Sequence, residues 1–380
     1  PSGLALKPGT SPELPDALHA LWDQRISAAL DDVVGDARAS RDDATSERPA
    51  DAARALELAA VLGSSVDLVE WDQAVKDAVR ASSLVHDVPA SLLDDVVEAL
   101  ARRGLARRTD GGFQFAHALV RGSVERRAKD AGRLALHHAT AAQALASLWG
   151  TDTPAAAARI GRHLLAAGAA LQALPHLLAA ARAALDEGDA LEAAGLLVDW
   201  ERARSSLRLG DGDVRVGPGL VLQAQLAHAE GRHVEARALA ARAVDVLRDA
   251  KQRAAALRIQ ASSALASSDL GDAESLYDAA RAGSASVEDE IGVGQAVRGL
   301  GDVAFWRGDK AKASALYVEV GRIFKDRGKH TDVALNLWNR GYVEIERGQL
   351  KEAKRLFVEM RKQCRAARDR CRSATPARSP

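Results

Sequence analysis

From Pro154 onward, the chain carries a spaced pattern of small residues that is typical of paired helices. A glycine recurs six times, a small residue lies seven positions before each glycine, and an alanine lies five positions after five of the six. The glycines are Gly168, Gly188, Gly231, Gly271, Gly308 and Gly348. Glycine easily adopts the left-handed conformation that ends a helix, and small residues let two helices approach closely. The pattern therefore predicts a series of helical hairpins over residues 154–372.

This pattern resembles the tetratricopeptide repeat (TPR), which has a small residue, a turn glycine and an alanine at the same spacing. The resemblance covers about residues 155–370. The period of the glycines here is longer than that of the TPR family, so we expect longer helices than the family standard. Two departures are visible: the unit at Gly271 lacks one residue in its turn, and Gly168 and Gly188 are half a period apart, so one of them marks a turn between repeats. The resemblance implies a TPR-like α-solenoid.

The composition favours an all-α fold. Apolar residues make up 47% of the 380 residues but aromatic residues only 4%, and the difference is mostly alanine, the best helix former. Lysine plus arginine equals aspartate plus glutamate, at 52 each, which argues against a generic binder of nucleic acid or anionic membranes. No apolar run approaches the length of a membrane span and no signal-peptide pattern opens the chain, so we expect a cytoplasmic protein without such a span. Cys364 and Cys371 lie roughly 10 Å apart along one predicted helix, too far for a disulfide.

Five parts can be assigned along the chain. A helix with a polar linker is followed by a winged-helix-like block, a connecting helix, the helical repeats and a disordered tail. Their bounds are 1–50, 51–120, 121–153, 154–372 and 373–380. The winged-helix-like block is predicted from three short helices, followed by a hairpin at Asp110 and Gly111. The helices span 51–62, 69–79 and 90–103. An Asp-Gly pair between two short extended runs favours a tight turn with positive φ.

Three stretches resemble the carboxy-terminal part of STAND-class signalling ATPases, such as large LuxR-type regulators and multidomain bacterial kinases. Residues 14–25 are similar to the helix that closes the ATPase module, and residues 55–63 resemble the opening of its winged-helix block. Residues 113–121 resemble the family segment F-x-F-x-H-x-L-V-R-E, with Gly122 in place of the glutamate. The resemblance implies that an upstream nucleotide-binding domain is missing here, and that the repeats receive a protein or small-molecule signal.

The same resemblance gives His117 a role. It matches the position at which related proteins place a histidine near the nucleotide phosphates, so it would act as a nucleotide sensor in the presence of the upstream domain. The alternative is that His117 packs where the hairpin meets the next helix. Both interpretations stay open.

The sequence holds none of the catalytic motifs that we searched for. It has no Walker phosphate loop and no zinc-protease, nucleophile-elbow or kinase signature. His137 and His138 point to different faces of a helix, and His228 and His233 straddle a repeat turn, so neither pair has a third metal ligand at suitable spacing. We therefore expect no enzymatic activity, no cofactor and no metal in this chain; ATP or ADP would belong to a full-length parent.

A DNA-binding transcription regulator is the alternative function. Four arginines surround the hairpin and could contact phosphates, as the wings of winged-helix proteins do. They are Arg102, Arg103, Arg107 and Arg108. Against this, the second and third helices of the block are acidic, and a helix that reads a DNA groove should not repel phosphate. We expect no DNA binding, and we interpret the basic segment from Lys351 onward as a solvated capping helix of the solenoid.

The repeat phase also predicts where a partner binds. With the turn glycine as origin, the first helix of each repeat lines the concave face at offsets of −13, −10, −6 and −3. These offsets select Gln225, His228, Arg258, Arg298, Asp302, Phe305, Trp338, Tyr342 and Ile345. Aromatic and arginine side chains are frequent interface anchors, so we expect a protein or peptide partner, or a small-molecule effector, in this groove. The alternative is that Trp338 and Phe305 fill gaps between repeats. The predicted function is a non-enzymatic sensor and interaction region of a signal-transduction protein.

Overall fold

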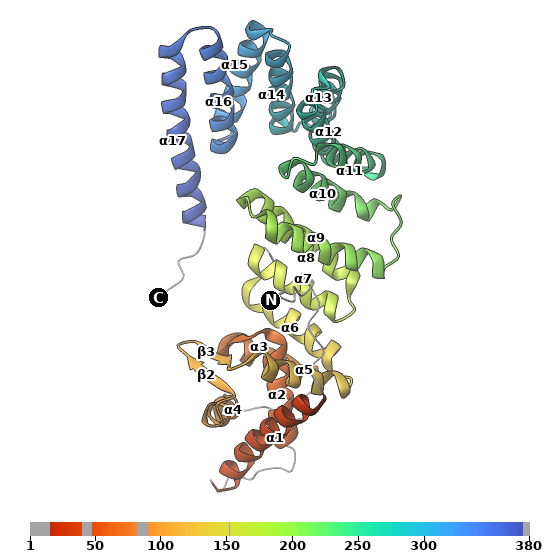
Figure 1. Ribbon diagram of the computed structural model, residues 1–380, viewed down its shortest axis with the longest axis vertical. Coiled ribbons are helices and arrows are strands. Elements are labelled where there is room, and N and C mark those ends of the chain that lie inside the picture. Colours follow the sequence, from red (N-terminus) through yellow and green to blue (C-terminus); the bar gives the residue numbers. More distant parts are fainter. Residues whose placement is uncertain (1–15, 40–47, 82–89, 152, 375–380) are drawn as a thin grey trace, which may run out of the picture. The chain divides into compact units, whose positions relative to one another are not determined.

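The computed structural model describes residues 16–39, 48–81, 90–151 and 153–374, and within these ranges the chain is mostly helical (Figure 1). The described residues form seventeen α-helices, one short 3-10 helix and one three-stranded sheet. The all-α fold that the composition favours and the solenoid that the repeat pattern predicts are confirmed. The chain divides into two compact units, Pro1–Ala180 and Ala181–Pro380. Part of the predicted linker, residues 40–47, and most of the predicted tail, residues 375–380, lie outside the described residues.

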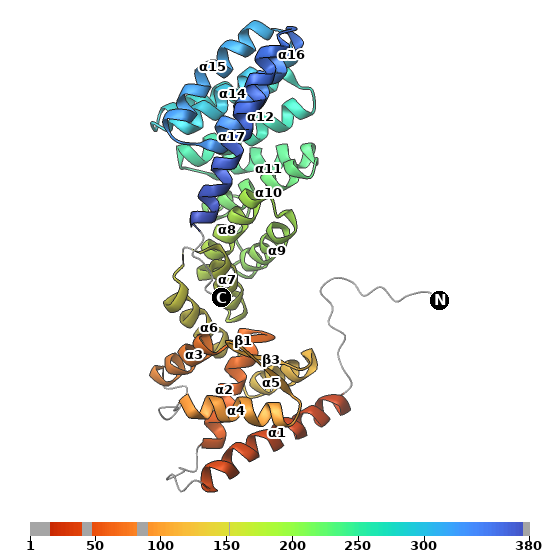
Figure 2. The same cartoon turned by 90° about the vertical axis from the view of Figure 1, so that its left-hand side faces the viewer.

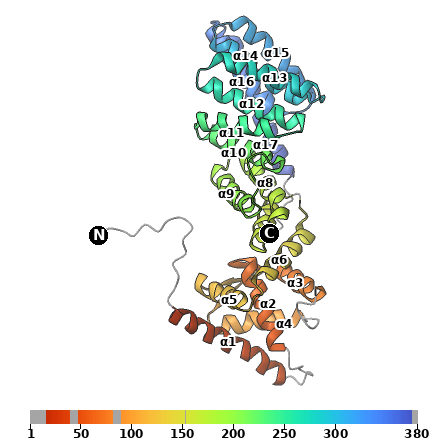
Figure 3. The same cartoon turned by 90° about the vertical axis from the view of Figure 1, so that its right-hand side faces the viewer.

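The first unit contains the predicted three short helices, a sheet and the helices that follow. Its elements are α1 (Asp16–Ala39), α2 (Arg48–Leu62), β1 (Ser65–Asp67), α3 (Leu68–Arg80), α4 (Ala90–Arg102), β2 (Ala106–Thr109), β3 (Gly112–Phe115), α5 (Ala118–Asp130), α6 (Leu134–Trp149), α7 (Pro154–Ala166) and the first part of α8 (Ala170–Glu187). Helix α1 packs against α2, α4 and α5 (Figure 3). Trp71 is fully buried in the core of this unit, where its indole Nε1 donates a 2.6 Å hydrogen bond to Ala55 O.

The predicted hairpin is present, as part of a three-stranded antiparallel sheet. Strands β2 and β3 form the hairpin, and β1 pairs with the other edge of β3, giving the order β1-β3-β2. The expected positive φ at the turn is wrong, because neither Asp110 nor Gly111 has one. Glycine is required at Gly112 instead, since a Cβ there would lie 1.9 Å from Val66 O on β1. The close approach of a third strand explains the glycine pair.

The segment 121–153, expected as one connecting helix, contains most of α5 and the whole of α6. Helices α5 and α6 are separated at Gly132, which has φ +71. A buried carboxylate ties α6 to α2: Glu57 accepts hydrogen bonds from Arg133 Nη2 at 2.6 Å and Nε at 2.9 Å. His137 Nε2 lies 2.8 Å from the same carboxylate. The chain therefore changes direction at Gly132, and the ion pair between Arg133 and Glu57 holds the start of α6 against α2.

The second unit is built from helix pairs. Its elements are the end of α8, α9 (Ala190–Ser206), the 3-10 helix (Val214–Val216), α10 (Gly217–Ala229), α11 (His233–Val246), α12 (Ala250–Ala266), α13 (Leu270–Ala285), α14 (Glu290–Trp306), α15 (Lys310–Asp326), α16 (His330–Glu346) and α17 (Leu350–Ala374). We call α10, α12, α14 and α16 the first helices and α11, α13, α15 and α17 the second helices. Neighbouring first helices contact one another directly, α10 with α12, α12 with α14, and α14 with α16. The first helices therefore form the inner layer of this unit (Figures 1 and 2).

The turns follow the predicted glycines with one correction. Gly231, Gly308 and Gly348 have positive φ, as expected, but the left-handed residue of the α12–α13 turn is Ser268, with φ +64. Gly271 lies inside α13, whose amino end is capped by Asp269. The longer helices are confirmed, because α14, α15 and α16 have 17 residues each. Small residues in the first helices do allow close approach: a Cβ on Gly301 would lie 2.6 Å from the Tyr317 ring.

Candidate functional site

The nine residues predicted to line a groove all lie on the first helices of the second unit. Gln225 and His228 are on α10, Arg258 is on α12, Arg298, Asp302 and Phe305 are on α14, and Trp338, Tyr342 and Ile345 are on α16. Moving the turn residue from Gly271 to Ser268 keeps Arg258 in the stripe, since it lies ten positions before Ser268 as Arg298 lies ten before Gly308. The structure divides these residues into a polar cavity, a charged cluster and an aromatic end.

The polar cavity has a volume of about 530 Å³ and is lined by residues from α10 to α14. Two predicted residues, His228 and Asp302, contribute to it. His233, Ser262, Leu265, Tyr277 and Trp306 also line it. Trp306 is 68% exposed, which is unusual for the largest aromatic side chain and leaves its ring open to a ligand. The volume lies within the range of small-molecule sites in proteins.

Asp302 is the acidic group of this cavity. Its Oδ1 atom accepts hydrogen bonds from the Tyr317 hydroxyl at 2.5 Å and from Asn339 Nδ2 at 2.7 Å. Its Oδ2 atom accepts none from the described part of the chain. Burial raises the pKa of Asp302 to about 6, against the lowering effects of the Tyr317 hydrogen bond and of Arg298. The carboxylate is thus ionised at neutral pH with one oxygen unpartnered.

Two histidines form another wall of the cavity. His228 Nδ1 lies 3.0 Å from the hydroxyl oxygen of the fully buried Ser263, and the rings of His228 and His233 are 5.1 Å apart. Burial, and to a lesser degree the neighbouring His233, lowers the pKa of His228, so its ring is neutral at pH 7. His233 Nδ1 is buried without a hydrogen-bond partner among the described residues. The cavity therefore holds one buried unsatisfied nitrogen, His233 Nδ1, and one carboxylate oxygen, Asp302 Oδ2, that accepts no hydrogen bond from the described residues.

Arg258 and Arg298 form the charged cluster with carboxylates of the following pair. Arg298 Nη1 lies 3.4 Å from Asp332 Oδ1, and its guanidinium carbon lies 5.9 Å from the centre of the Phe324 ring. Burial lowers the pKa of Arg258, while the charges of Asp289 and Asp332 oppose that shift. Arg298 is therefore paired within the chain, whereas Arg258 Nη1 is buried without a hydrogen-bond partner among the described residues.

The aromatic end lies on α16 and α17. Trp338 is 43% and Tyr342 44% exposed, their ring centres are 5.0 Å apart, and both pack against Phe357 on α17. Ile345 and Phe357 line a separate pocket of about 400 Å³. Phe305 differs from them, because it is half-buried against a cluster that contains Tyr317 and Val343. Phe305 therefore fills a gap between repeats, whereas Trp338 and Tyr342 keep exposed surface.

Sequence reasoning missed His233, Tyr277 and Trp306 as cavity residues. Tyr277 had a usable signal, because Tyr317 and Phe357 follow it at two equal intervals and mark one repeated position on the second helices. Trp306 follows the predicted Phe305 directly. His233 offered no signal beyond its place just after a repeat turn.

His117, the predicted nucleotide sensor, lies in the first unit at the amino end of α5. It is exposed, and its side chain makes no capping hydrogen bond to the helix. Its ring centre lies 6.1 Å from that of Trp22 on α1, and the Arg25 guanidinium lies 4.9 Å from the Trp22 ring. The two stretches that resemble the STAND family, around Trp22 and around His117, thus meet in space.

Arg103 and Arg108 of the hairpin are engaged by acidic residues. Arg103 donates to both carboxylate oxygens of Asp32 on α1, at 2.7 and 2.8 Å. Arg108 lies 3.5 Å from Glu98 and 3.8 Å from Asp94, both on α4. A phosphate would have to displace these carboxylates before it could bind either arginine.

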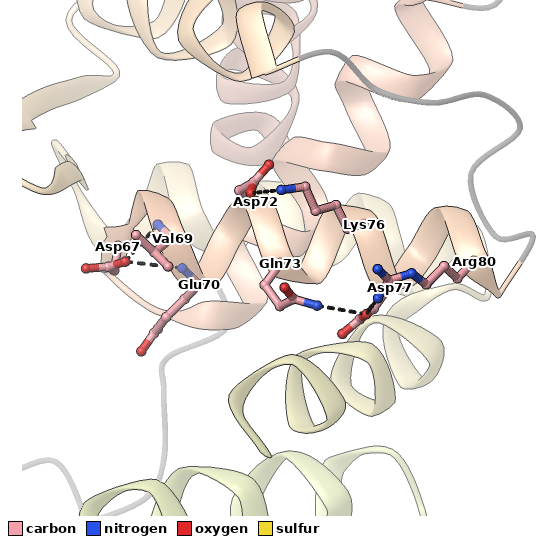
Figure 4. Close-up of polar contacts among 8 residues, drawn as sticks. All are labelled: Asp67, Val69, Glu70, Asp72, Gln73, Lys76, Asp77 and Arg80. Carbon is pink, nitrogen blue, oxygen red and sulfur yellow. Dashed lines mark hydrogen bonds and ion pairs between the residues drawn. The ribbon is translucent and has the colours of Figure 1, made fainter. Parts of the chain in front are cut away.

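Helix α3 presents acidic side chains that are neutralised locally (Figure 4). Asp67 caps the helix by accepting from the backbone amides of residues 69 and 70. Asp72 pairs with Lys76 at 2.5 Å, and Asp77 pairs with Arg80 at 3.0 Å (Figure 4). These pairs leave α3 without a basic stripe that could follow a phosphate backbone.

Across residues 16–39, 48–81, 90–151 and 153–374, no group of three or more His, Cys, Asp or Glu side chains is placed to hold a metal ion. Among the helices in these ranges, none combines the length and apolarity needed to cross a membrane.

The comparisons with known proteins return structural likenesses. No protein-family model matches the chain, and no curated protein matches its sequence. One similar solved structure is BtubC (BKLC) from P. vanneervenii, at 19% identity and a TM-score of 0.41, over 67% of this chain and 96% of that one. Another is a STAND protein with a tetratricopeptide repeat sensor from Pyrococcus horikoshii, at 11% identity and a TM-score of 0.40. That likeness covers 92% of this chain and 63% of the STAND protein.

Proposed function

We propose that this chain is a non-enzymatic sensor and interaction region, whose inner layer of first helices binds a partner segment or a small effector in the polar cavity. The cavity itself carries the proposal. It gathers side chains from successive helix pairs, and one of its polar atoms, His233 Nδ1, is buried without a hydrogen-bond partner among the described residues. Buried polar atoms are normally hydrogen-bonded, so this nitrogen favours a bound ligand, and Asp302 Oδ2 is a further acceptor that the described residues leave open.

The chemistry of the cavity restricts the ligand. An ionised carboxylate accepts hydrogen bonds and donates none, so the ligand must present a donor to Asp302. The exposed Trp306 ring offers a flat apolar surface beside it. A peptide side chain with an N–H or O–H group next to an apolar group meets both requirements.

The test selects peptides on the intact chain from a displayed library of random peptides about twelve residues long. Binding of the enriched peptide, labelled with fluorescein, is then measured by anisotropy. We expect Asp302→Asn and Trp306→Ala each to weaken binding by about tenfold or more. The control is Leu191→Ala on α9, which removes another exposed apolar side chain and should have no effect. Equal binding by all four proteins would refute the cavity as the binding site.

We also propose that residues 51–120 form a winged-helix block of a STAND-class signalling protein. The element order α2, β1, α3, α4, β2, β3 and the sheet order β1-β3-β2 support the winged-helix interpretation. The contact between Trp22 and His117 supports a shared site for an upstream nucleotide domain. This chain alone should not bind ATP, because it has no phosphate loop. Isothermal titration with Mg-ATP should show no binding heat, and a micromolar Kd would contradict the proposal.

A further inference from the structure

A second groove lies on the second-helix side of the last two pairs, away from the residues of the polar cavity. It has a volume of about 1030 Å³ and is lined by one stripe from each of three helices, α15, α16 and α17. On α17 the stripe runs from Lys351 to Lys362, a length of roughly 17 Å at 1.5 Å per residue. The groove therefore has the dimensions for a short helical segment of about three turns.

The groove is strongly basic. Seven basic side chains line it against two acidic ones, Asp326 and Glu359. Five of the seven make no ion pair with the described residues, namely Arg322, Lys325, Arg340, Lys351 and Lys354. Arg340 is half-buried, and this burial lowers its pKa, against the opposing charges of Glu352 and Glu344. The guanidinium has no paired carboxylate among the described residues, so it is available to an anion from outside.

The preceding repeat shows that the fold does not need these charges. Helix α16 follows α14 in the sequence by the same interval as α17 follows α15, so each groove position has an equivalent one helix pair earlier. The positions equivalent to Arg322, Lys325, Arg340, Lys351, Lys354 and Arg355 are occupied by Ala282, Ala285, Leu300, Ala311, Ser314 and Ala315. Helices of the same kind pack with small or apolar residues at these positions. The basic side chains of the groove are therefore not required for helix packing.

The walls of the groove carry exposed apolar side chains. Val318 on α15 is 39% exposed and Val358 on α17 is 47% exposed, and they occupy equivalent positions of successive helix pairs. Leu337 on α16 lies on the floor. A nucleic-acid backbone gains nothing from such valines, whereas an amphipathic protein segment buries them. The combination of apolar walls and basic rims selects an acidic partner with an apolar stripe.

We infer that the α15–α17 groove is a docking site for an acidic amphipathic helix of a protein partner. Its leucine-like side chains would lie between Val318 and Val358, and its carboxylates would pair with the basic residues of the rims. This inference is independent of the polar cavity, because the two sites share no residue. Asp302→Asn should leave binding in the groove unchanged.

The experiment uses the intact chain and a fluorescein-labelled probe peptide of about fourteen residues, made of glutamate and alanine with leucines at i, i+3, i+4 and i+7. Anisotropy compares it with the same peptide in which serine replaces leucine, and with a labelled oligothymidylate of similar net charge. We expect the leucine peptide to bind at least about fivefold more tightly than the serine peptide, and Val358→Ser to reduce this difference. The labelled oligothymidylate should bind more weakly than the leucine peptide.

A charge-matched pair of double variants tests the location. Arg322→Glu with Lys354→Glu reverses two exposed groove charges, and we expect it to weaken the leucine peptide by about tenfold or more. Arg248→Glu with Arg253→Glu makes the same change in net charge around the start of α12, where both arginines are also exposed, and should change binding less than about twofold. All four side chains are exposed, so melting temperatures should stay close to that of the parent protein.

Three results would overturn the inference. If both double variants weakened binding of the leucine peptide equally, the peptide would be attracted by the net charge of the protein and not by the groove. Tighter binding of oligothymidylate, unaffected by Val358→Ser, would identify a nucleic-acid groove. A concentration-dependent dimer in sedimentation that the groove variant dissociates would identify a second copy of this chain as the occupant.

Discussion

The Tyr317 hydroxyl on α15 donates a 2.5 Å hydrogen bond to Asp302 Oδ1 on α14. Asn339 on α16 donates to the same oxygen, so two donors hold one side of the carboxylate and leave Oδ2 beside the cavity. The result is an acid that is oriented by two helices of the solenoid and keeps one oxygen open to a ligand. Such an arrangement keeps a hydrogen-bond acceptor at the inner face at some expense of stability.

Tyr317→Phe should destabilise the fold and alter the acid together. Removing the hydroxyl leaves Oδ1 with one donor fewer, so we expect the free energy of unfolding to fall by about 1–2 kcal/mol in urea titrations. The pKa of Asp302 should rise further, because this hydrogen bond is one of the causes that lower it. Phe357→Tyr, at the equivalent position one repeat later, is the control and should stay within about 0.5 kcal/mol. An unchanged Asp302 pKa in the Phe variant, read by carboxyl-carbon NMR, would disprove the coupling.

Asp302→Asn should make the protein more stable at pH 8 and weaker as a binder. The folded-state pKa of about 6 lies above the ordinary value of 3.8, so the folded state holds the proton more tightly. Stability from this group is therefore greatest below pH 4 and declines as pH rises through 6. The Asn variant removes that penalty and should gain about 1–3 kcal/mol at pH 8, with little difference at pH 4. A loss of stability at pH 8 would contradict the assignment.

Gly301→Ala and Gly271→Ala should have opposite signs. A Cβ on Gly301 would lie 2.6 Å from the Tyr317 ring, so we expect a loss of about 1–3 kcal/mol. Gly271 lies in α13 with negative φ and open space around its Cβ position. Alanine there should add about 0.5–1 kcal/mol. Thermal melts of both variants test the repeat packing, and equal effects would show that the close approach at Gly301 does not exist.

The first unit should become less stable in acid through His163. Its Nδ1 lies 3.0 Å from His138 Nδ1, and burial lowers the pKa of His163 from 6.5 to about 3. The unfolded chain therefore binds one more proton than the folded chain between about pH 3 and 6.5, and stability falls as pH decreases through that window. His163→Asn should flatten this slope in urea titrations at pH 7, 6 and 5. A slope identical to that of the parent would mean that other groups control the acid transition.

DNA binding should be weak and steeply salt-dependent. Arg103 and Arg108 are held by carboxylates, so a duplex would gain few phosphate contacts. Gel shifts at physiological salt should show no discrete complex. A sequence-specific complex that survives there and is lost on Arg107→Ala with Arg108→Ala would instead make the winged-helix block a DNA reader.

The repeats were predictable because their signal is local and periodic. The positions of Gly308 and Gly348, and the small residues before them, report directly on helix ends and on helix contact. Ser268 was missed because serine in the left-handed conformation is uncommon, and the nearby Gly271 mimicked the expected pattern. The break at Gly132 was visible in the sequence as a glycine, although the segment was assigned to one connecting helix.

The site was less predictable than the fold. The offsets found His228 and Asp302, but the cavity depends on Tyr277 from a second helix and on His233 just after a turn, which no single stripe contains. Strand β1 was also missed, because so short a strand carries no periodicity and pairs with a strand much later in the chain. Contacts between distant segments determine both features, and a single sequence does not report such contacts.

The left-handed turn residues Ser268, Gly308 and Gly348 follow one another at equal intervals, and this regularity has an evolutionary consequence. Helices α14, α15 and α16 are equal in length and are joined by turns with a left-handed glycine, so successive helix pairs share one phase. Duplication or loss of one complete helix pair would therefore preserve the phase of every remaining helix. The length of the inner face can therefore change by one helix pair at a time through gene duplication. The cavity and the basic groove can diverge separately by point mutation.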